Sequence, residues 1–239
     1  MLDKIPSTSY SHMPFLTKDA ANNDVLFLCL APPELNVFGN RTWKIYFIDS
    51  FHDEPVRIDT KMTSATFECS PTGWYDENGW HVSFIAGGDP DNPLFQLFLM
   101  EGPTLETLRD PVVAQTSSRS GFVSKDRMIY SSKTIEYDYI INGTERMEFD
   151  LSEILRVSYQ ADQPHKMLIS YKKDDEIYTI RYDMNDRTME KIICDGQPAY
   201  KFTMYGDTII YARIIDDGFE NRKLTVAQNI QFTPLSAFP

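Results

Sequence analysis

The chain has 239 residues, of which 42% are apolar and 13% aromatic, and this is enough for one core or at most two small ones. Such a composition excludes a disordered or fibrous chain. The 35 acidic residues outnumber the 23 basic ones and give a formal net charge of −12, so the average surface repels nucleic-acid phosphates and anionic lipid headgroups. We therefore expect neither nucleic acid nor a membrane among the partners.

The N-terminal segment and the cysteines predict a protein that folds in a reducing compartment. Residues 1–10 do not have the basic region followed by an apolar stretch that is typical of a secretory signal. The longest apolar run, 25–31, is far shorter than the roughly 20 residues of a membrane-spanning helix. Cys29, Cys69 and Cys194 lie in apolar segments without metal-ligand spacing, which indicates buried, reduced thiols. We expect a cytoplasmic protein or one incorporated into a virion, not secreted by a signal peptide, and no metal or cofactor.

Short segments rich in Val, Ile, Phe, Tyr and Thr recur along the chain between clusters of Gly, Asn, Asp and Pro. This pattern predicts many short antiparallel strands, and helical periodicity is almost absent. The segments form five triplets, which in chain order are 24–30, 43–49 and 55–59; 80–86, 94–100 and 111–114; 127–131, 135–141 and 146–150; 166–171, 177–182 and 189–193; and 208–214, 223–227 and 230–233.

A shorter and less apolar segment precedes each triplet, at 11–16, 65–70, 120–124, 156–160 and 201–205. Each repeat therefore has four strands, and the mean period is about 46 residues, which is typical of a β-propeller blade. We predict an all-β, five-bladed propeller with four antiparallel strands per blade. As a single domain, 1–239, it has blades at approximately 9–61, 62–117, 118–152, 153–196 and 197–239. A large β-sandwich or two small β domains remain the alternatives.

The position of the less apolar segments has a physical reason. In a propeller the first strand of each blade lines the central channel, where polar side chains are tolerated. The middle strands are covered on both faces by the neighbouring blades, so they read as continuous apolar runs such as 25–30 and 94–100.

Residues 67–84 resemble a blade of the five-bladed glycosidases of the arabinanase and invertase group. They place Glu68 beside Cys69 on the predicted channel strand, followed by a turn with Asp and Gly and then an aromatic strand. Residues 95–111 are similar to the strand-and-loop pattern of that group, and Arg109-Asp110-Pro111 has the letters of one of its motifs. The resemblance implies the propeller fold, and it implies that Glu68 occupies the position of the general acid.

The sequence departs from that group in the carboxylates. Glycosidases of this kind need two or three carboxylates from the channel strands of different blades. The Arg-Asp-Pro letters come after Glu68 instead of before it, and they precede an outer strand. The first channel segment, 10–15, has no carboxylate where a nucleophile is expected. Bases lie in or near the later channel segments instead, namely Arg119, Arg156, Lys166 and Lys201.

Several residues are candidates for contact with a ligand or partner. Glu68, Arg119, Arg156 and Lys201 form a mixed-charge lining for a polar ligand, or simply pair with one another. His12 and His81 are each a candidate base or ligand, or a hydrogen-bonded structural histidine. Trp74 and Tyr75 lie in a loop rich in Gly, Asp and Asn, where aromatic rings can stack on a sugar or a partner, whereas Trp43 and Trp80 are expected to pack between blades.

From these features we predict a non-catalytic binding or assembly module without catalytic residues. It would dock on protein partners, on a second copy of itself or on glycans, as a virion structural or adsorption protein does. The alternative is a small glycosidase-like hydrolase that acts on a polysaccharide with Glu68 as general acid.

Overall fold

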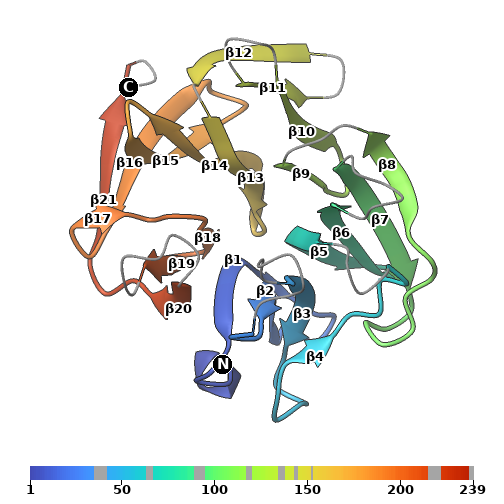
Figure 1. The fold of residues 1–239 in the computed structure, drawn as a ribbon. Helices are drawn as coiled ribbons and strands as arrows, with labels where there is room; N and C mark the ends of the chain where they lie inside the picture. The colour runs from blue at the N-terminus through green and yellow to red at the C-terminus, as the bar shows by residue number, and fades with distance from the viewer. Residues whose placement is uncertain are drawn as a thin grey trace.

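The computed structural model describes residues 1–34, 42–62, 67–88, 95–116, 120–133, 138–142, 145–151, 153–214 and 222–236. Five antiparallel sheets stand in a ring, as Figure 1 shows, and the predicted five-bladed β-propeller is therefore confirmed. A single 3-10 turn, η1 (Leu2–Lys4), precedes the first blade. No helix within the described ranges is long and apolar enough to cross a bilayer.

Each blade is a meander in which strands that follow one another in the chain pair with one another. Blade 1 contains β1 (Tyr10–Lys18), β2 (Asp24–Ala31), β3 (Lys44–Ile48) and β4 (Val56–Arg57). Blade 2 contains β5 (Phe67–Asp76), β6 (Gly79–Gly87), β7 (Gln96–Gly102) and β8 (Val112–Thr116). Blade 3 contains β9 (Ser120–Val123), β10 (Met128–Lys133), β11 (Asp138–Asn142) and β12 (Glu145–Leu151).

The last two blades depart from the four-strand plan. Blade 4 contains β13 (Glu153–Gln160), β14 (Gln163–Lys173), β15 (Glu176–Asp183) and β16 (Thr188–Cys194), and its edge also carries the short β17 (Gln197–Pro198) and the C-terminal β21 (Ile230–Leu235). Blade 5 contains β18 (Thr203–Tyr205), β19 (Thr208–Ile214) and β20 (Arg222–Val226), three strands within the described residues.

The five inner strands, β1, β5, β9, β13 and β18, point their edges toward the centre of the ring (Figure 1). They overlap the five less apolar segments of the sequence. The next strand outward is covered on both faces: every residue of β6 is buried, as are seven of the eight residues of β2. The continuous apolar runs of these strands therefore reflect burial between neighbouring blades.

The C-terminal strand corrects one expectation. Residues 230–233 were predicted as the fourth strand of blade 5, but β21 pairs with β16 of blade 4 from Ile230 opposite Cys194 to Leu235 opposite Met189. Asp195 directs this pairing, because its Oδ1 accepts the backbone N–H groups of Gln228 and Asn229 at 3.0 and 2.8 Å. The strand β21 therefore extends the edge of blade 4 and not that of blade 5.

Ring closure depends on the N-terminal segment. The backbone N–H of Leu224 on β20 donates to Ser11 Oγ on β1 at 3.0 Å, and the N–H of Leu16 donates to Thr203 Oγ1 on β18, also at 3.0 Å. Side chains of η1 and its surroundings pack with Leu224 in one apolar cluster. Blade 1 is thereby joined to blade 5 without a shared strand.

Candidate functional site

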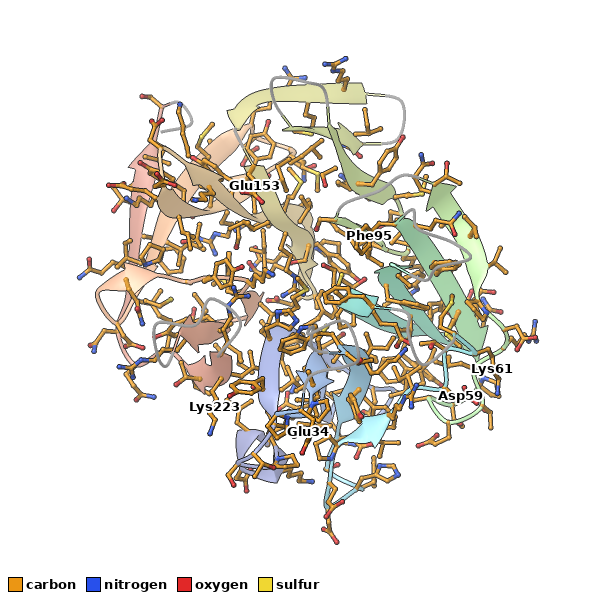
Figure 2. The ribbon with its side chains drawn as sticks, in the orientation of Figure 1. Glu34, Asp59, Lys61, Phe95, Glu153 and Lys223 are labelled. Atoms are coloured by element: carbon orange, nitrogen blue, oxygen red, sulfur yellow. The ribbon has the colours of Figure 1, made fainter. Side chains whose placement is uncertain are left out.

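Four basic side chains from three blades lie at the centre of the ring. His12 is on β1, Arg156 on β13, Lys201 immediately before β18, and Arg222 at the start of β20. Each is at most 9% exposed. We call these four residues the central basic cluster. Figure 2 shows that side chains fill the space between the blades.

Arg156 is the most deeply buried member, at 1% exposed. Its Nη1 donates to the carbonyl oxygens of Lys201 and Phe202, each at 3.3 Å, and these bonds fix the plane of the guanidinium against blade 5. Nε and Nη2 are buried and make no hydrogen bond with the described residues. Burial lowers the pKa of Arg156 to about 10, although the Cys29 and Cys69 thiols oppose this shift.

Lys201 stands beside two other cations. Burial, followed by the charges of Arg222 and Arg156, lowers the pKa of its amine to about 7. The Tyr200 ring lies under both neighbouring bases, with its centroid 5.2 Å from Lys201 Nζ and 4.3 Å from Arg222 Cζ. The negative face of this ring stabilises positive charge without neutralising it.

His12 completes the cluster from blade 1. Its ring packs on the Trp43 indole with a centroid distance of 3.8 Å, and neither ring nitrogen has a hydrogen-bond partner among the described residues. Burial lowers the pKa of His12 well below its usual value, and the charges of Lys201, Arg222 and Arg156 lower it further. The imidazole is therefore neutral at pH 7 and carries one N–H donor.

Glu68 lies apart from this cluster, in the interface between blades 1 and 2. Its Oε1 accepts hydrogen bonds from Lys44 Nζ at 2.6 Å and from Thr60 Oγ1 at 2.9 Å, and its Oε2 accepts one from the Ile45 N–H at 3.4 Å. The side chain is fully buried. Glu68 therefore pairs with Lys44, a base that is not among the predicted lining residues Arg119, Arg156 and Lys201.

The two other carboxylates on the described parts of the inner strands lie at strand ends. Asp76 is at the β5–β6 hairpin, where its Oδ1 accepts the Asn78 N–H at 2.8 Å and lies 3.1 Å from His81 Nε2. Glu153 is exposed at the start of β13 (Figure 2).

The remaining predicted residues are scattered. Trp74 is half-buried and stacks on His81 with a centroid distance of 4.5 Å, while the neighbouring Tyr75 is 40% exposed. Arg119 lies outside the described residues. Arg109 is exposed on blade 2, where its backbone N–H donates to the Glu101 carbonyl before outer strand β8.

Sequence reasoning missed Arg222 and Tyr200. Arg222 opens the third strand of blade 5, a position that faces the core only because β20 packs against β1. Its sequence neighbourhood carries no signal for this, since a base at the start of a strand is usually exposed. The structure also places Cys29 and Cys69, both buried free thiols, beside the cluster.

No family model matches this sequence, and no curated protein is similar to it. Several solved structures, however, have a fold similar to that of this chain. They include the GH43 β-xylosidase/α-arabinofuranosidase CoXyl43 from a compost microbial metagenome, determined in a calcium-free form with xylotriose (TM-score 0.56, 10% identity, 93% of this chain and 92% of that chain). The GH43_1 enzyme from Xanthomonas citri complexed with xylotriose follows at a TM-score of 0.55 and 10% identity, covering 97% and 89% of the two chains.

This chain shares a five-bladed propeller fold with these glycoside hydrolases. A hypothetical protein from Leishmania major also shares it, with a TM-score of 0.51 and 8% identity over 93% of this chain and 86% of that one. At such low identity the likeness concerns the fold, and the chemistry has to be argued from this chain's own side chains.

Proposed function

We propose that this protein is a carbohydrate-binding β-propeller that holds a glycan at the central basic cluster and does not cleave it. The observation that carries the proposal is Arg156, a buried guanidinium whose Nε and Nη2 lack acceptors among the described residues. A buried donor without an acceptor costs about 1–3 kcal/mol, and more when it is charged. A ligand oxygen at these nitrogens would offset that cost.

The fold supports a glycan as the ligand. Two of the similar structures were determined with xylotriose, and they match 93% and 97% of this chain. Three members of the cluster also lie on or beside the inner strands of blades 1, 4 and 5, which face the central channel of a propeller.

The carboxylates argue for binding without hydrolysis. Glycoside hydrolysis requires a pair of carboxyl groups on either side of the scissile bond. Among the described residues of the inner strands, Glu68 is buried in an ion pair with Lys44, and Asp76 and Glu153 lie at strand ends. Only the fold supports the second candidate, a hydrolase with Glu68 as general acid.

Titration calorimetry and a glycan array test the binding. We expect the native protein to bind a subset of glycans, and Arg156→Met to lose that binding while it keeps its circular dichroism spectrum. Arg109→Met, which removes an exposed base from the outer part of blade 2, is the matched control and should bind normally. Absence of binding to any glycan would overturn the proposal.

A hydrolysis assay separates the two candidates. The native protein should release no product from aryl glycosides or from any glycan that it binds. Turnover by the native protein that disappears in Glu68→Gln, while the variant keeps its circular dichroism spectrum, would establish the hydrolase instead. Docking on a protein partner or a second copy remains a separate prediction, and light scattering of the purified chain tests whether it forms a defined oligomer.

A further inference from the structure

We infer that the group bound at the central basic cluster is an oxyanion carried by a sugar, in the first place the carboxylate of a uronic acid. The inference rests on the proposed function and names its ligand class. Its starting point is the charge of the cluster: the buried Arg156 guanidinium lies near the Lys201 amine, and no described carboxylate is among the main groups that shift the pKa values of His12, Arg156 and Lys201.

The geometry of Arg156 selects the shape of the anion. Its Nη1 donates to two carbonyl oxygens of blade 5, whereas Nε and Nη2, which form one edge of the guanidinium, are buried and have no hydrogen-bond partner among the described residues. Two parallel N–H groups on that edge match the two oxygens of a carboxylate, or two oxygens of a sulfate or phosphate ester. A neutral hydroxyl would accept from one of them and leave the other unpaired.

The surroundings make an anion more favourable than a neutral sugar. Buried positive charge that lacks a counter-charge is expensive, because the low local polarity weakens its solvation while it strengthens the attraction to an anion. Lys201 and Arg222 supply that attraction, and the neutral His12 adds a directional N–H donor. An oxyanion would balance the charge of Arg156, whose Nε and Nη2 have no acceptor among the described residues.

Binding of an anion should also change the protonation of Lys201. At pH 8 the Lys201 amine, with a pKa of about 7, is mostly neutral. A bound anion favours the charged amine, so Lys201 takes up a proton from the buffer when the anion binds. Binding should therefore be weaker at pH 8 than at pH 6.

The experiment compares matched sugars by calorimetry and by thermal shift. Glucuronate and galacturonate and their oligomers are set against glucose, galactose and xylotriose, and a sugar sulfate, a sugar phosphate, inorganic sulfate and acetate serve as further arms. We expect uronates to bind about tenfold or more tightly than their neutral counterparts, a difference of about 1.4 kcal/mol. In two buffers of different ionisation enthalpy, proton uptake at pH 8 should appear in the native protein and disappear in Lys201→Met.

The variants resolve the role of Arg156. Arg156→Lys keeps the charge but removes the two-pronged edge, so uronate affinity should fall by about tenfold or more, while Arg109→Met should leave it unchanged. If Arg156 variants do not fold, the proton uptake measured in two buffers, and its loss in Lys201→Met, test instead whether an anion binds at the cluster. Uronates and neutral sugars that bind equally well would overturn the anion and leave glycan binding standing.

Each of the remaining results would overturn a different part of the inference. Tighter binding of a sugar sulfate or phosphate would overturn the uronate and keep the sugar oxyanion. Inorganic sulfate or acetate that binds as tightly as any sugar acid would overturn the sugar as the carrier of the anion. If no sugar of either kind binds, both the proposed function and this inference fall.

Discussion

Lys44 Nζ on β3 lies 2.6 Å from Glu68 Oε1 on β5, and this buried ion pair joins blade 1 to blade 2. Thr60 Oγ1 donates to the same carboxylate, so the acid is hydrogen-bonded as well as paired. The position that resembles the general acid of a glycosidase is thus occupied by an interface contact between blades.

Glu68→Gln tests this structural role. The substitution removes the negative charge that contacts the buried Lys44 ammonium, and removal of one partner from a buried ion pair costs about 3–5 kcal/mol. We expect the free energy of unfolding in urea to fall by an amount of this order. Asp59→Asn, which breaks an exposed pair with Lys61, is the control and should change stability by less than about 1 kcal/mol. A Glu68→Gln protein as stable as the native one would contradict the role.

Lys201→Met should stabilise the protein at neutral pH. The pKa of Lys201 is about 7 in the folded protein and near the usual 10.5 when the chain is unfolded, so the unfolded chain binds more protons between these values. The native protein therefore gains stability as pH rises from about 7 to 10, and below pH 7 it bears the full cost of the buried amine. The variant lacks this cost, on the order of a few kcal/mol.

Urea unfolding at several pH values measures this effect. The difference in unfolding free energy between Lys201→Met and the native protein should be largest at pH 7 and should shrink toward pH 10. Lys166→Met, on β14 outside the cluster, serves as the control and should show no such trend. A difference in unfolding free energy that does not change with pH would mean that folding does not lower the pKa of Lys201.

Asp195→Ala should release the C-terminal strand. Backbone N–H bonds from Asn229 and Gln228 hold the pKa of this carboxyl below its usual value, together with a bond from the Tyr211 hydroxyl. Hydrogen exchange should show that β21 loses protection while the inner strands keep theirs. Because the folded-state pKa is lowered, the contribution is present above about pH 4 and is lost as pH falls through the lowered value.

A second hairpin provides the comparison for this experiment. Asp19→Ala removes an equivalent acceptor from the β1–β2 turn, where Asp19 Oδ1 accepts the Ala21 and Asn23 N–H groups. It should leave β21 fully protected. If β21 exchanged no faster in Asp195→Ala than in Asp19→Ala, the ladder with β16 alone would be sufficient to retain the strand.

Gly121→Ala should destabilise blade 3. A Cβ at Gly121 on β9 would lie 2.7 Å from the Ile129 carbonyl oxygen and 2.9 Å from Tyr130 Cα, both in the backbone of β10. Overpacking against backbone costs about 1–3 kcal/mol, measured here as a lower midpoint of urea unfolding. Gly206→Asn is the control, because its site has open space and a φ of +54°, which Asn tolerates. Equal midpoints in the two variants would contradict the close approach.

The sequence alone determined the five-bladed architecture and nominated part of the site. Strand composition and period are local properties, repeated five times, so the inner strands could be recognised from segments such as 11–16 and 156–160. His12, Arg156 and Lys201 were each candidates because they stand on or beside those segments. Trp74 and Tyr75, by contrast, prove to belong to a hairpin with His81 and remain candidates for partner contact.

Only the tertiary structure decided which of these residues meet. Lys201 is 45 residues from Arg156 in sequence, and Lys44 is 24 residues from Glu68, so no local pattern can reveal either contact. The same holds for Arg222, which is buried where β20 packs against β1, and for β21, which pairs with β16 of blade 4 and not with blade 5. The physical reason is that strand identity follows from neighbours along the chain, whereas charge pairing and edge pairing follow from neighbours in space.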